Sequence, residues 1–240
     1  MTVLFLALRA LVFYLILALS VVVFSLALYI LLPLPFHWGR KQIPGLWSHF
    51  IRNVGRFVCG LRYEISGTEN IPATPVVFLV KHQSAWETMA LPASLPPISV
   101  VCKEALLNIP IFGWSIRIAR AIPINRSAGV SAFKKVIQIG QARLQEGLSV
   151  LIFPEGTRVA PREHPRFHKT GVLLALNAGV PIIPIAHNSG LLWRRNEFIK
   201  RPGLIRVVVG PAIDTHNKTP EMVNEAVHAW MQTQMEQLEQ

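Results

Sequence analysis

Apolar residues form one long run near the start of the chain and then recur as short runs between polar segments. Residues 11–32, LVFYLILALSVVVFSLALYILL, contain no charged side chain. As a helix this run would be about 33 Å long, enough to cross a hydrocarbon layer of about 30 Å. The pattern therefore predicts a membrane-anchoring helix. The alternative is a signal peptide, whose apolar part is normally shorter and ends at small residues, whereas PLPFHWGRK follows here.

The rest of the chain alternates strand-like with helix-like patterns. Strand-length apolar runs occur at residues 62–66, 75–80, 149–153, 181–186 and 204–210. Helical patterns cover residues 128–146, the segment from Thr170 to Gly179, and the segment that begins at Thr219. This alternation predicts an α/β fold with a mixed, largely parallel sheet flanked by helices.

The chain is expected to have two parts. Residues 1–60 would form the membrane anchor and a juxtamembrane helical linker, and residues 61–240 would form the α/β domain. Trp38 and Trp47 in the linker would either lie at the lipid interface or pack on the domain. The sequence leaves both positions open.

The charges that flank the apolar run predict its orientation. Arg9 precedes the run, and five basic residues follow it: Arg40, Lys41, Arg52, Arg56 and Arg62. The positive-inside rule then places the α/β domain in the cytoplasm. A helix or helical hairpin inserted into one leaflet would have the same charge pattern, so a transmembrane span and a monotopic insertion remain alternatives.

The charge balance indicates an anionic partner. The chain has 24 Lys and Arg against 13 Asp and Glu, a formal charge of +11. Nucleic acid, acidic lipid and a phosphorylated substrate all fit this charge. One cluster of four basic residues would either face anionic lipid headgroups or form a solvated surface. It consists of Arg194, Arg195, Lys200 and Arg201.

Cysteine and histidine spacing indicates no metal site. Cys59 and Cys102 lack a CxxC spacing, which argues against zinc and a disulfide framework and fits a reducing cytoplasm. His164 and His168 are four residues apart, but Pro165 disfavours the helix that would bring them together, and no third ligand is evident.

The stretch VVFLVKHQSAWETM contains the first candidate for chemistry. His82 ends an apolar strand, and ligands bind beyond the carboxyl ends of strands in open α/β sheets. We interpret His82 as a base and Glu87 as the acid that orients it. Ser84 and Glu87 also fit a capping box, and both roles are compatible if His82 lies in the turn before the helix. His216 and Glu221 have the same spacing but lie at the start of the last helix, where an acid needs no catalytic role.

Three further predicted strand ends carry polar or basic residues. Lys103 follows PPISVV, and Arg126 ends IPINR. SVLIFPEGTR ends in Glu155, Gly156, Thr157 and Arg158. A glycine lets backbone amides approach a ligand, and the planar guanidinium of arginine matches phosphate oxygens. Together with His82, these strand ends would form a cationic pocket around an imidazole.

These blocks resemble the glycerolipid acyltransferases related to bacterial 1-acyl-glycerol-3-phosphate acyltransferase, over residues 60–212. HQSAWE resembles the first motif of that family, IPINR the second, FPEGTR the third and VPIIPIA the fourth. The resemblance rests on the order and spacing of all four blocks. Two positions depart from the family pattern: Glu87 stands where Asp is usual, and Asn125 stands where an acid often precedes Arg126.

The resemblance implies an activity. A fatty acyl group would move from an acyl thioester, acyl-CoA or acyl carrier protein, to the sn-2 hydroxyl of lysophosphatidic acid, giving phosphatidic acid with no cofactor. His82 would be the general base, held in the required tautomer by Glu87. The acceptor phosphate would be bound by Lys103, Arg126 and Arg158. The acceptor pocket would be shaped by Glu155, Gly156 and Thr157, although Glu155 would equally serve to hold Arg158.

The implied setting is the cytoplasmic membrane of a bacterium, with the catalytic domain facing the cytoplasm. The expected partners are lysophosphatidic acid, the acyl donor and anionic membrane lipid, and no nucleic acid. Another lysolipid acceptor, such as a lysophospholipid with a headgroup or a lyso-aminolipid, is an alternative. A non-catalytic, membrane-anchored phospholipid-binding protein is a second. The sequence distinguishes neither acyl-CoA from acyl carrier protein nor one chain length from another.

Overall fold

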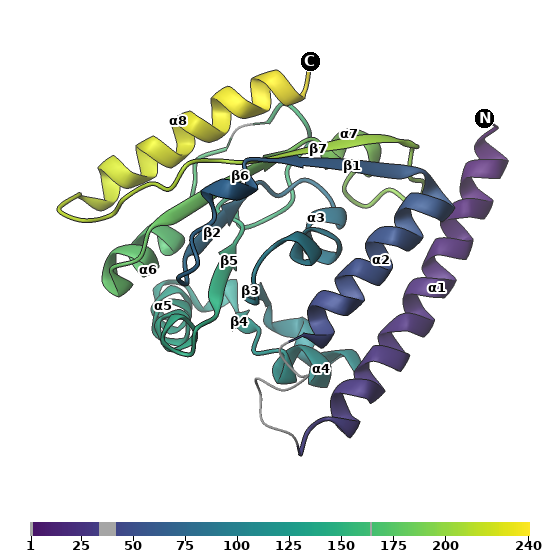
Figure 1. Ribbon diagram of the computed structural model, residues 1–240, viewed down its shortest axis with the longest axis horizontal. Helices are drawn as coiled ribbons and strands as arrows, with labels where there is room; N and C mark the ends of the chain where they lie inside the picture. Colours follow the sequence, from purple (N-terminus) through teal and green to yellow (C-terminus); the bar gives the residue numbers. More distant parts are fainter. Residues whose placement is uncertain (1, 34–41, 164) are drawn as a thin grey trace.

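The computed structural model describes residues 2–33, 42–163 and 165–240, and describes Arg126 by its backbone alone. Figure 1 shows a twisted sheet with helices on both faces and a long N-terminal helix along one side. The strands are β1 Leu61–Ser66, β2 Val77–Val80, β3 Ile98–Lys103, β4 Ile122–Ile124, β5 Ser149–Ile152, β6 Ile182–His187 and β7 Gly203–Val209. The helices are α1 Val3–Ile30, α2 Ile43–Cys59, α3 Trp86–Met89, α4 Phe112–Ile118, α5 Val130–Gln145, α6 Thr170–Ala178, α7 Ser189–Leu192 and α8 Pro220–Leu238.

Within the described residues the strands form one seven-stranded sheet in the order β1-β7-β6-β2-β5-β3-β4. The pair β6 and β7 is antiparallel, and every other neighbouring pair is parallel. The predicted mixed, largely parallel sheet is confirmed. Because β6, β2, β5, β3 and β4 run the same way, their carboxyl ends share one edge of the sheet.

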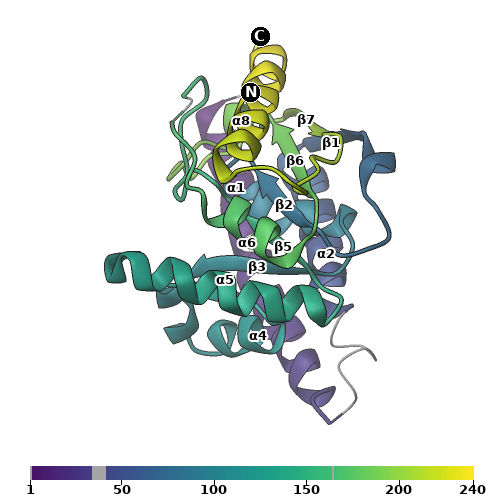
Figure 2. The same cartoon turned by 90° about the vertical axis from the view of Figure 1, so that its left-hand side faces the viewer.

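Alternate residues of the central strands pack against different helical layers. Val77 and Leu79 of β2 belong to the core beneath α5, α6 and α8. Phe78 and Val80 belong to the core beneath α1, α2 and α3. Figure 2 shows α5, α6 and α8 in front of the sheet and α1 behind it. Strands covered on both faces are apolar at successive positions, which explains why the sequence shows continuous rather than alternating runs here.

Helix ends follow the expected capping residues. Gly179 after α6 has a φ of 64°, the left-handed conformation that favours glycine at this position. At the start of α8, the Thr219 hydroxyl accepts a hydrogen bond from the Met222 amide at 3.3 Å, and Pro220 is the first helical residue. These caps set where α6 ends and where α8 begins, and both helices cover the core that contains Val77 and Leu79.

The N-terminal helix differs from the expected one in extent and surroundings. It begins at Val3 rather than at residue 11, so Arg9, which precedes the apolar run, lies within the helix. The Arg9 Nε donates a hydrogen bond to the Val58 carbonyl, which joins the start of α1 to the end of α2. Arg52 and Arg56 therefore lie beside α1 on a helix that runs back along it (Figure 1). Arg40 and Lys41 lie outside the described residues, so the orientation inferred from the charge count stays a prediction.

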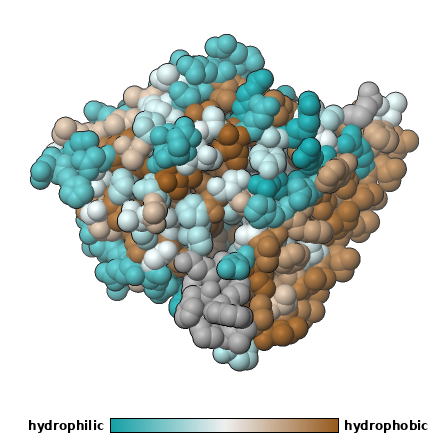
Figure 3. All heavy atoms as spheres, viewed as in Figure 1, coloured by the Kyte–Doolittle hydropathy of each residue, from teal (hydrophilic) through white to brown (hydrophobic). Residues whose placement is uncertain are grey.

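α1 is nevertheless long and apolar enough to cross a membrane, and 22% of its most apolar window is buried inside the protein. Figure 3 shows apolar side chains gathered along the side of the molecule formed by α1. Trp47 packs inward, since its indole nitrogen donates to the Ser20 hydroxyl of α1 at 3.1 Å. Trp38 lies outside the described residues. α1 is therefore a candidate anchor that is also packed on the domain.

Candidate active site

The predicted contact between His82 and Glu87 is present. His82 lies in the turn between β2 and α3, and its Nδ1 is 2.9 Å from the Glu87 Oε1. A carboxylate accepts hydrogen bonds but does not donate them, so the hydrogen of the neutral imidazole is on Nδ1. The other ring nitrogen, Nε2, then carries a lone pair. This is the tautomer that a base requires.

Glu87 also makes the predicted capping contacts. It is fully buried, and its Oε1 accepts hydrogen bonds from the backbone amides of Gln83 and Ser84 at 2.9 and 2.8 Å. The Ser84 hydroxyl donates to Oε2 at 2.7 Å and accepts from the Trp86 amide at 2.8 Å. Capping and orienting therefore coexist in one carboxylate. Ser84 is buried and has these partners, so it is a helix cap rather than a nucleophile.

The surroundings of Glu87 keep it ionised. Burial raises the pKa of this carboxyl, but the hydrogen bonds from the His82 imidazole and the Ser84 hydroxyl outweigh that effect and hold the pKa below its usual range. A charged carboxylate next to His82 stabilises the imidazolium that forms when His82 takes a proton. The pair is thus arranged for general-base chemistry.

The turn after β5 packs against the imidazole ring of His82. The Phe153 ring stacks on the imidazole with centroids 4.0 Å apart. The Val159 amide donates to the His82 carbonyl at 2.9 Å. These contacts bring FPEGTR against HQSAWE, as the shared edge of parallel strands predicts.

Glu155 has a different partner from the one considered in the sequence. Its Oε1 is 3.2 Å from the Lys81 Nζ, and both side chains are shielded from solvent. Burial raises the pKa of Glu155, and the Lys81 ammonium opposes that rise. The Lys81 ammonium also donates to the Glu163 carbonyl at 2.9 Å. Glu155 therefore pairs with Lys81, and the idea that it holds Arg158 is wrong.

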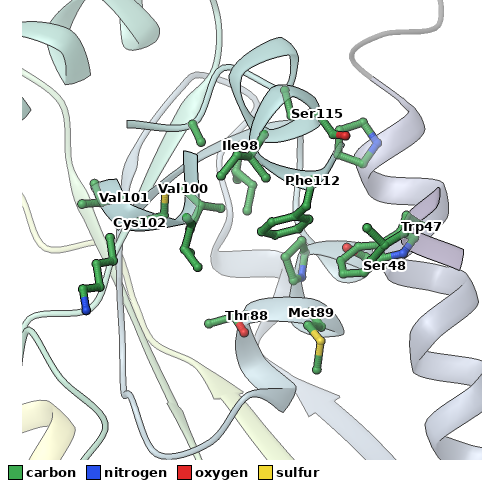
Figure 4. Close-up of a pocket in the computed structure, with 18 of the residues that line it drawn as sticks. Trp47, Ser48, Thr88, Met89, Ile98, Val100, Val101, Cys102, Phe112 and Ser115 are labelled. Carbon is green, nitrogen blue, oxygen red and sulfur yellow. The ribbon is translucent and has the colours of Figure 1, made fainter. Parts of the chain in front are cut away.

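An apolar cavity of about 520 Å³ extends from His82 between α1, α2, β3 and α4. Figure 4 shows Trp47, Ile98, Val100 and Phe112 on its walls. Its other apolar walls include Val21, Phe24, Leu28, Met89, Val101 and Ile116. Polar residues also line it, among them Lys103, Thr157, Arg158, Arg195 and Asn196. One cavity thus has a largely apolar lining together with cationic side chains and one imidazole.

The predicted site residues are distributed over two cavities. Lys103, Thr157 and Arg158 line the large one together with His82. Glu155, Gly156 and Thr157 line a second cavity of about 310 Å³. Gly156 has a φ of 71°, and a Cβ there would lie 3.1 Å from the His168 ring, so the turn needs glycine.

The second motif is described only in part. Arg126 begins a 3-10 turn, Arg126–Ala128, directly after β4, but its side chain lies outside the described part of the chain. Asn125 stands where an acid is common, and its Oδ1 accepts hydrogen bonds from the Ser127 amide and hydroxyl at 3.2 and 2.6 Å. An amide oxygen thus stabilises this turn as a carboxylate oxygen would.

The predicted surface group of four basic residues is partly wrong. Lys200 is 2% exposed and lies among aromatic rings, so it is not at the surface. Arg201 pairs with Glu197 through its Nη1 and Nη2 atoms, each 2.6 Å from one oxygen of the carboxylate. Arg195 lines the large cavity and donates to the Arg158 carbonyl at 2.9 Å, which makes it a site residue that the sequence did not indicate.

Two buried residues next to Glu87 were also missed. His187 ends β6 and Ser189 begins α7, and both are fully buried. The sequence does contain a sign of His187, because this histidine stands at the end of an apolar run, as His82 does. The fourth motif, VPIIPIA, stops one residue before it.

No group of three or more possible metal ligands occurs within the described ranges of the chain. His164, one half of the pair considered above, lies outside the described residues. Cys102 lines the large cavity, and burial raises its pKa to about 11, so it stays a thiol and is a poor nucleophile.

Comparison with known proteins agrees with this geometry. A sequence profile described as Acyltransferase matches residues 62–188. The chain is 39% identical to the 1-acyl-sn-glycerol-3-phosphate acyltransferase of Pseudomonas aeruginosa, over 97% of this chain and 92% of that protein. It is 30% identical to a mouse relative, 1-acyl-sn-glycerol-3-phosphate acyltransferase alpha, over 70% of this chain and 60% of that one. The crystal structure of the 1-acyl-sn-glycerophosphate acyltransferase of Thermotoga maritima has the same fold, with a TM-score of 0.82 at 21% identity over 96% of this chain and 95% of that chain.

Proposed function

Because this chain belongs to the acyltransferase family, we propose that it transfers a fatty acyl group from an acyl thioester to the sn-2 hydroxyl of 1-acyl-glycerol 3-phosphate. The product would be phosphatidic acid. The carrying observation is the ordered pair of His82 and Glu87 at a cavity whose lining is mostly apolar and also includes three cationic side chains. The names of the bacterial and mouse relatives support the choice of acceptor.

His82 is the general base in this proposal. Its Nε2 takes the proton from the sn-2 hydroxyl as the hydroxyl oxygen attacks the thioester carbonyl carbon. The carbon–sulfur bond then breaks, and the imidazolium returns the proton to the departing thiolate. Such a base typically contributes about 10² to 10⁴ in rate. Glu87 stabilises the imidazolium while it exists, at the 2.9 Å separation seen in the structure.

The cations near His82 would hold the acceptor phosphate. Lys103, Arg158 and Arg195 line the cavity together with His82. We assign Arg126 to the same role from the second motif, since its turn follows β4 at the same sheet edge. Guanidinium groups bind phosphate through paired hydrogen bonds, which would place the acceptor hydroxyl near the imidazole. Gly156 and Thr157 would shape the neighbouring surface.

The apolar part of the cavity would hold an acyl chain. Its walls come from helices α1, α2 and α4 as well as from β3, and its residues are chiefly apolar. Burial of methylene groups is favourable by about 0.8 kcal/mol each, so a cavity of this kind binds a fatty chain without any charged contact. The thioester donor, acyl-CoA or acyl carrier protein, would enter with no further cofactor.

α1 and α2 would attach the domain to the cytoplasmic face of the inner membrane. The two helices run side by side, and the exposed apolar residues of α1 form a continuous surface (Figures 1 and 3). An insertion into one leaflet would leave both chain termini on the cytoplasmic side. Proteins tagged at either terminus can be treated with protease in inverted and right-side-out vesicles. Cleavage of both tags only in inverted vesicles supports this placement, whereas opposite sidedness of the two tags contradicts it.

The activity can be tested with purified membranes that contain wild type or His82→Ala. Lysophosphatidic acid, glycerol 3-phosphate, a lysophospholipid with a headgroup and a lyso-aminolipid are offered in parallel, each with acyl-CoA and with acyl carrier protein. We expect transfer to lysophosphatidic acid that falls at least about 10²-fold in the variant. Transfer to another acceptor would overturn the substrate assignment, and undiminished transfer by His82→Ala would overturn the mechanism.

A further inference from the structure

Behind the His82 and Glu87 pair lies a second set of buried polar groups that the mechanism above does not use. It consists of His187, at the end of β6, and Ser189, at the start of α7. Both are 0% exposed. Ser189 lies 102 residues after Glu87 in the chain, with His187 two residues before it, and the pairing of β6 with β2 brings both to Glu87. Buried polar groups are costly unless they are hydrogen-bonded, so their contacts indicate what they do.

Ser189 touches Glu87 directly. Its Oγ is 3.1 Å from the Glu87 Oε2 and 2.9 Å from the Ser84 hydroxyl. The Ser84 hydroxyl already donates its one hydrogen to Oε2 at 2.7 Å. The hydroxyl of Ser189 therefore serves as the second side-chain donor to this carboxylate oxygen. Hydrogen bonds to a charged group are stronger than those between neutral groups.

His187 contacts both Ser189 and the segment after β2 that carries His82. Its Nε2 is 2.7 Å from the Lys81 carbonyl, and a carbonyl only accepts, so the imidazole hydrogen is on Nε2. Its Nδ1 then has a lone pair, which accepts from the Ser189 amide at 3.4 Å. The Ser189 hydroxyl, also near Nδ1 at 3.1 Å, is left to donate to Glu87. The neutral imidazole thus fits every contact around it.

The electrostatic setting agrees with a neutral His187. Burial lowers the pKa of His187, Glu87 opposes this effect, and His82 and Lys81 add to it. These three groups are the charged or titratable neighbours that act on the ring. His187 is 4.0 Å from the Glu87 Oε2, so a positive charge on it would compete with His82 for the same carboxylate. A neutral His187 leaves the charge of Glu87 available to His82.

We propose that Ser189 and His187 are positioning residues for acyl transfer, which fix the Glu87 carboxylate as the charge partner of His82 without touching substrate. The inference rests on the proposed role of His82 as the base. Ser189 acts through its hydrogen bond to Oε2 of Glu87. His187 acts through the orientation of Ser189 and through the Lys81 carbonyl, next to His82 in the chain.

The test compares Ser189→Ala with a matched serine. Ser149→Ala is the control, because Ser149 is also buried and hydrogen-bonded, to the Val76 amide at 3.1 Å, but lies at the amino end of β5. We expect kcat of Ser189→Ala to fall about tenfold, the loss of one hydrogen bond to a charged group, with KM for donor and acceptor within about twofold of wild type. Ser149→Ala should keep the wild-type kcat. Ser189→Cys, which retains a weak donor, should be intermediate.

The pH profile separates a positioning role from a merely structural one. A Glu87 carboxylate that has lost a donor binds protons more readily, so it loses the charge that supports His82 at a higher pH than in wild type. The acid limb of kcat/KM should therefore move to higher pH in Ser189→Ala and stay unchanged in Ser149→Ala. His187→Gln places an amide donor near the Lys81 carbonyl, but lacks the ring nitrogen that accepts from Ser189, and should show the same direction of shift with a smaller loss of kcat.

His82→Ala is measured in parallel so that two kinds of failure are distinguishable. If wild type is inactive, or His82→Ala is as active as wild type, the proposed function fails. If His82→Ala is inactive while Ser189→Ala and His187→Gln keep the wild-type kcat and pH profile, only the positioning role is overturned. Equal losses in Ser189→Ala and Ser149→Ala, with an unmoved acid limb, also overturn it. Circular dichroism establishes that each variant is folded, and Ser189→Cys replaces Ser189→Ala if the latter is not.

Discussion

The ammonium of Lys81 and the carboxylate of Glu155 form an ion pair, 3.2 Å between Nζ and Oε1, that is shielded from solvent. Lys81 directly follows β2 and precedes His82, and Glu155 lies in the turn after β5. The Glu155 Oε1 also accepts a hydrogen bond from the His82 amide at 3.4 Å. The pair therefore joins the two turns that form the candidate site. Its first role is to hold those turns together, whatever else Glu155 does toward a substrate.

Breaking this ion pair on one side should cost more stability than removing both charges. Lys81→Met leaves the buried Glu155 carboxylate unpaired, and such losses are typically about 3 to 5 kcal/mol. The double variant Lys81→Met, Glu155→Gln removes both charges and should be more stable than Lys81→Met alone. Urea unfolding in detergent of wild type, Lys81→Met, Glu155→Gln and the double variant measures the coupling energy between the two charges. Additive effects would show that the two charges do not interact.

Glu87→Gln should preserve the fold and lose most of the activity. The amide oxygen can still accept from the backbone amides of Gln83 and Ser84, so the cap survives. A neutral amide does not stabilise the imidazolium of His82, so we expect kcat to fall about 10² to 10⁴-fold. Steady-state kinetics and a thermal melt measure the two effects. Wild-type turnover in this variant would mean that Glu87 is a helix cap alone.

Arg158→Gln should weaken binding of the acceptor and not of the donor. Arg158 lines the cavity beside His82, and loss of a charge-assisted contact to phosphate should raise the acceptor KM about tenfold or more. Arg194→Gln is the control, since Arg194 is exposed and is not among the cavity residues. Initial rates with each substrate varied in turn measure both KM values. A larger change in the donor KM would contradict the phosphate assignment.

Ser115→Phe should shorten the acyl chain that the enzyme accepts. Ser115 of α4 lines the cavity, and its hydroxyl donates to the Ser25 hydroxyl of α1 at 2.5 Å. A phenyl ring there would occupy part of the apolar space that a long chain needs. We expect kcat/KM to fall about tenfold for long-chain donors while short-chain donors keep their rates. A series of acyl-CoA lengths measures the preference, and an equal loss at every length would contradict this site for the chain.

Lys200 should make stability depend on pH. The distance from its Nζ to the Tyr14 ring centroid is 3.4 Å, and it donates to the Phe198 carbonyl at 2.9 Å. Burial lowers the pKa of Lys200 from 10.5 to about 8, so between these values the unfolded chain binds more protons than the folded one. The free energy of unfolding should therefore rise with pH across this window.

Lys200→Met provides the matched control, because it fills the same space and does not titrate. The difference in free energy of unfolding between wild type and Lys200→Met should increase from about pH 7.5 to about pH 10. Lys200→Ala should lose about 2 kcal/mol or more at both pH values, through the cavity it leaves. Chemical unfolding followed by circular dichroism measures these differences. A pH-independent difference between wild type and Lys200→Met would mean that Lys200 titrates alike in both states.

The sequence by itself determined the helices and strands of the domain and the pair of His82 and Glu87. The central strands are buried on both faces, so they appear as continuous apolar runs, and the helices between them end at glycine or begin at threonine. Parallel strands place their carboxyl ends at one edge, which is why His82, Lys103 and Arg158 were found together. His82 and Glu87 are close in the chain, so a local turn was enough to predict their contact.

Tertiary structure alone decided the contacts between distant segments. Lys81 pairs with Glu155, and Ser189 reaches Glu87, because strand order places β2 between β5 and β6. The burial of Lys200 depends on aromatic rings from α1 and from the segment after α7. The return of α2 along α1 determined where the basic residues of α2 lie. Local patterns carry the preference of each segment for helix or strand, whereas these contacts arise from the packing of segments that adjoin only in the folded chain.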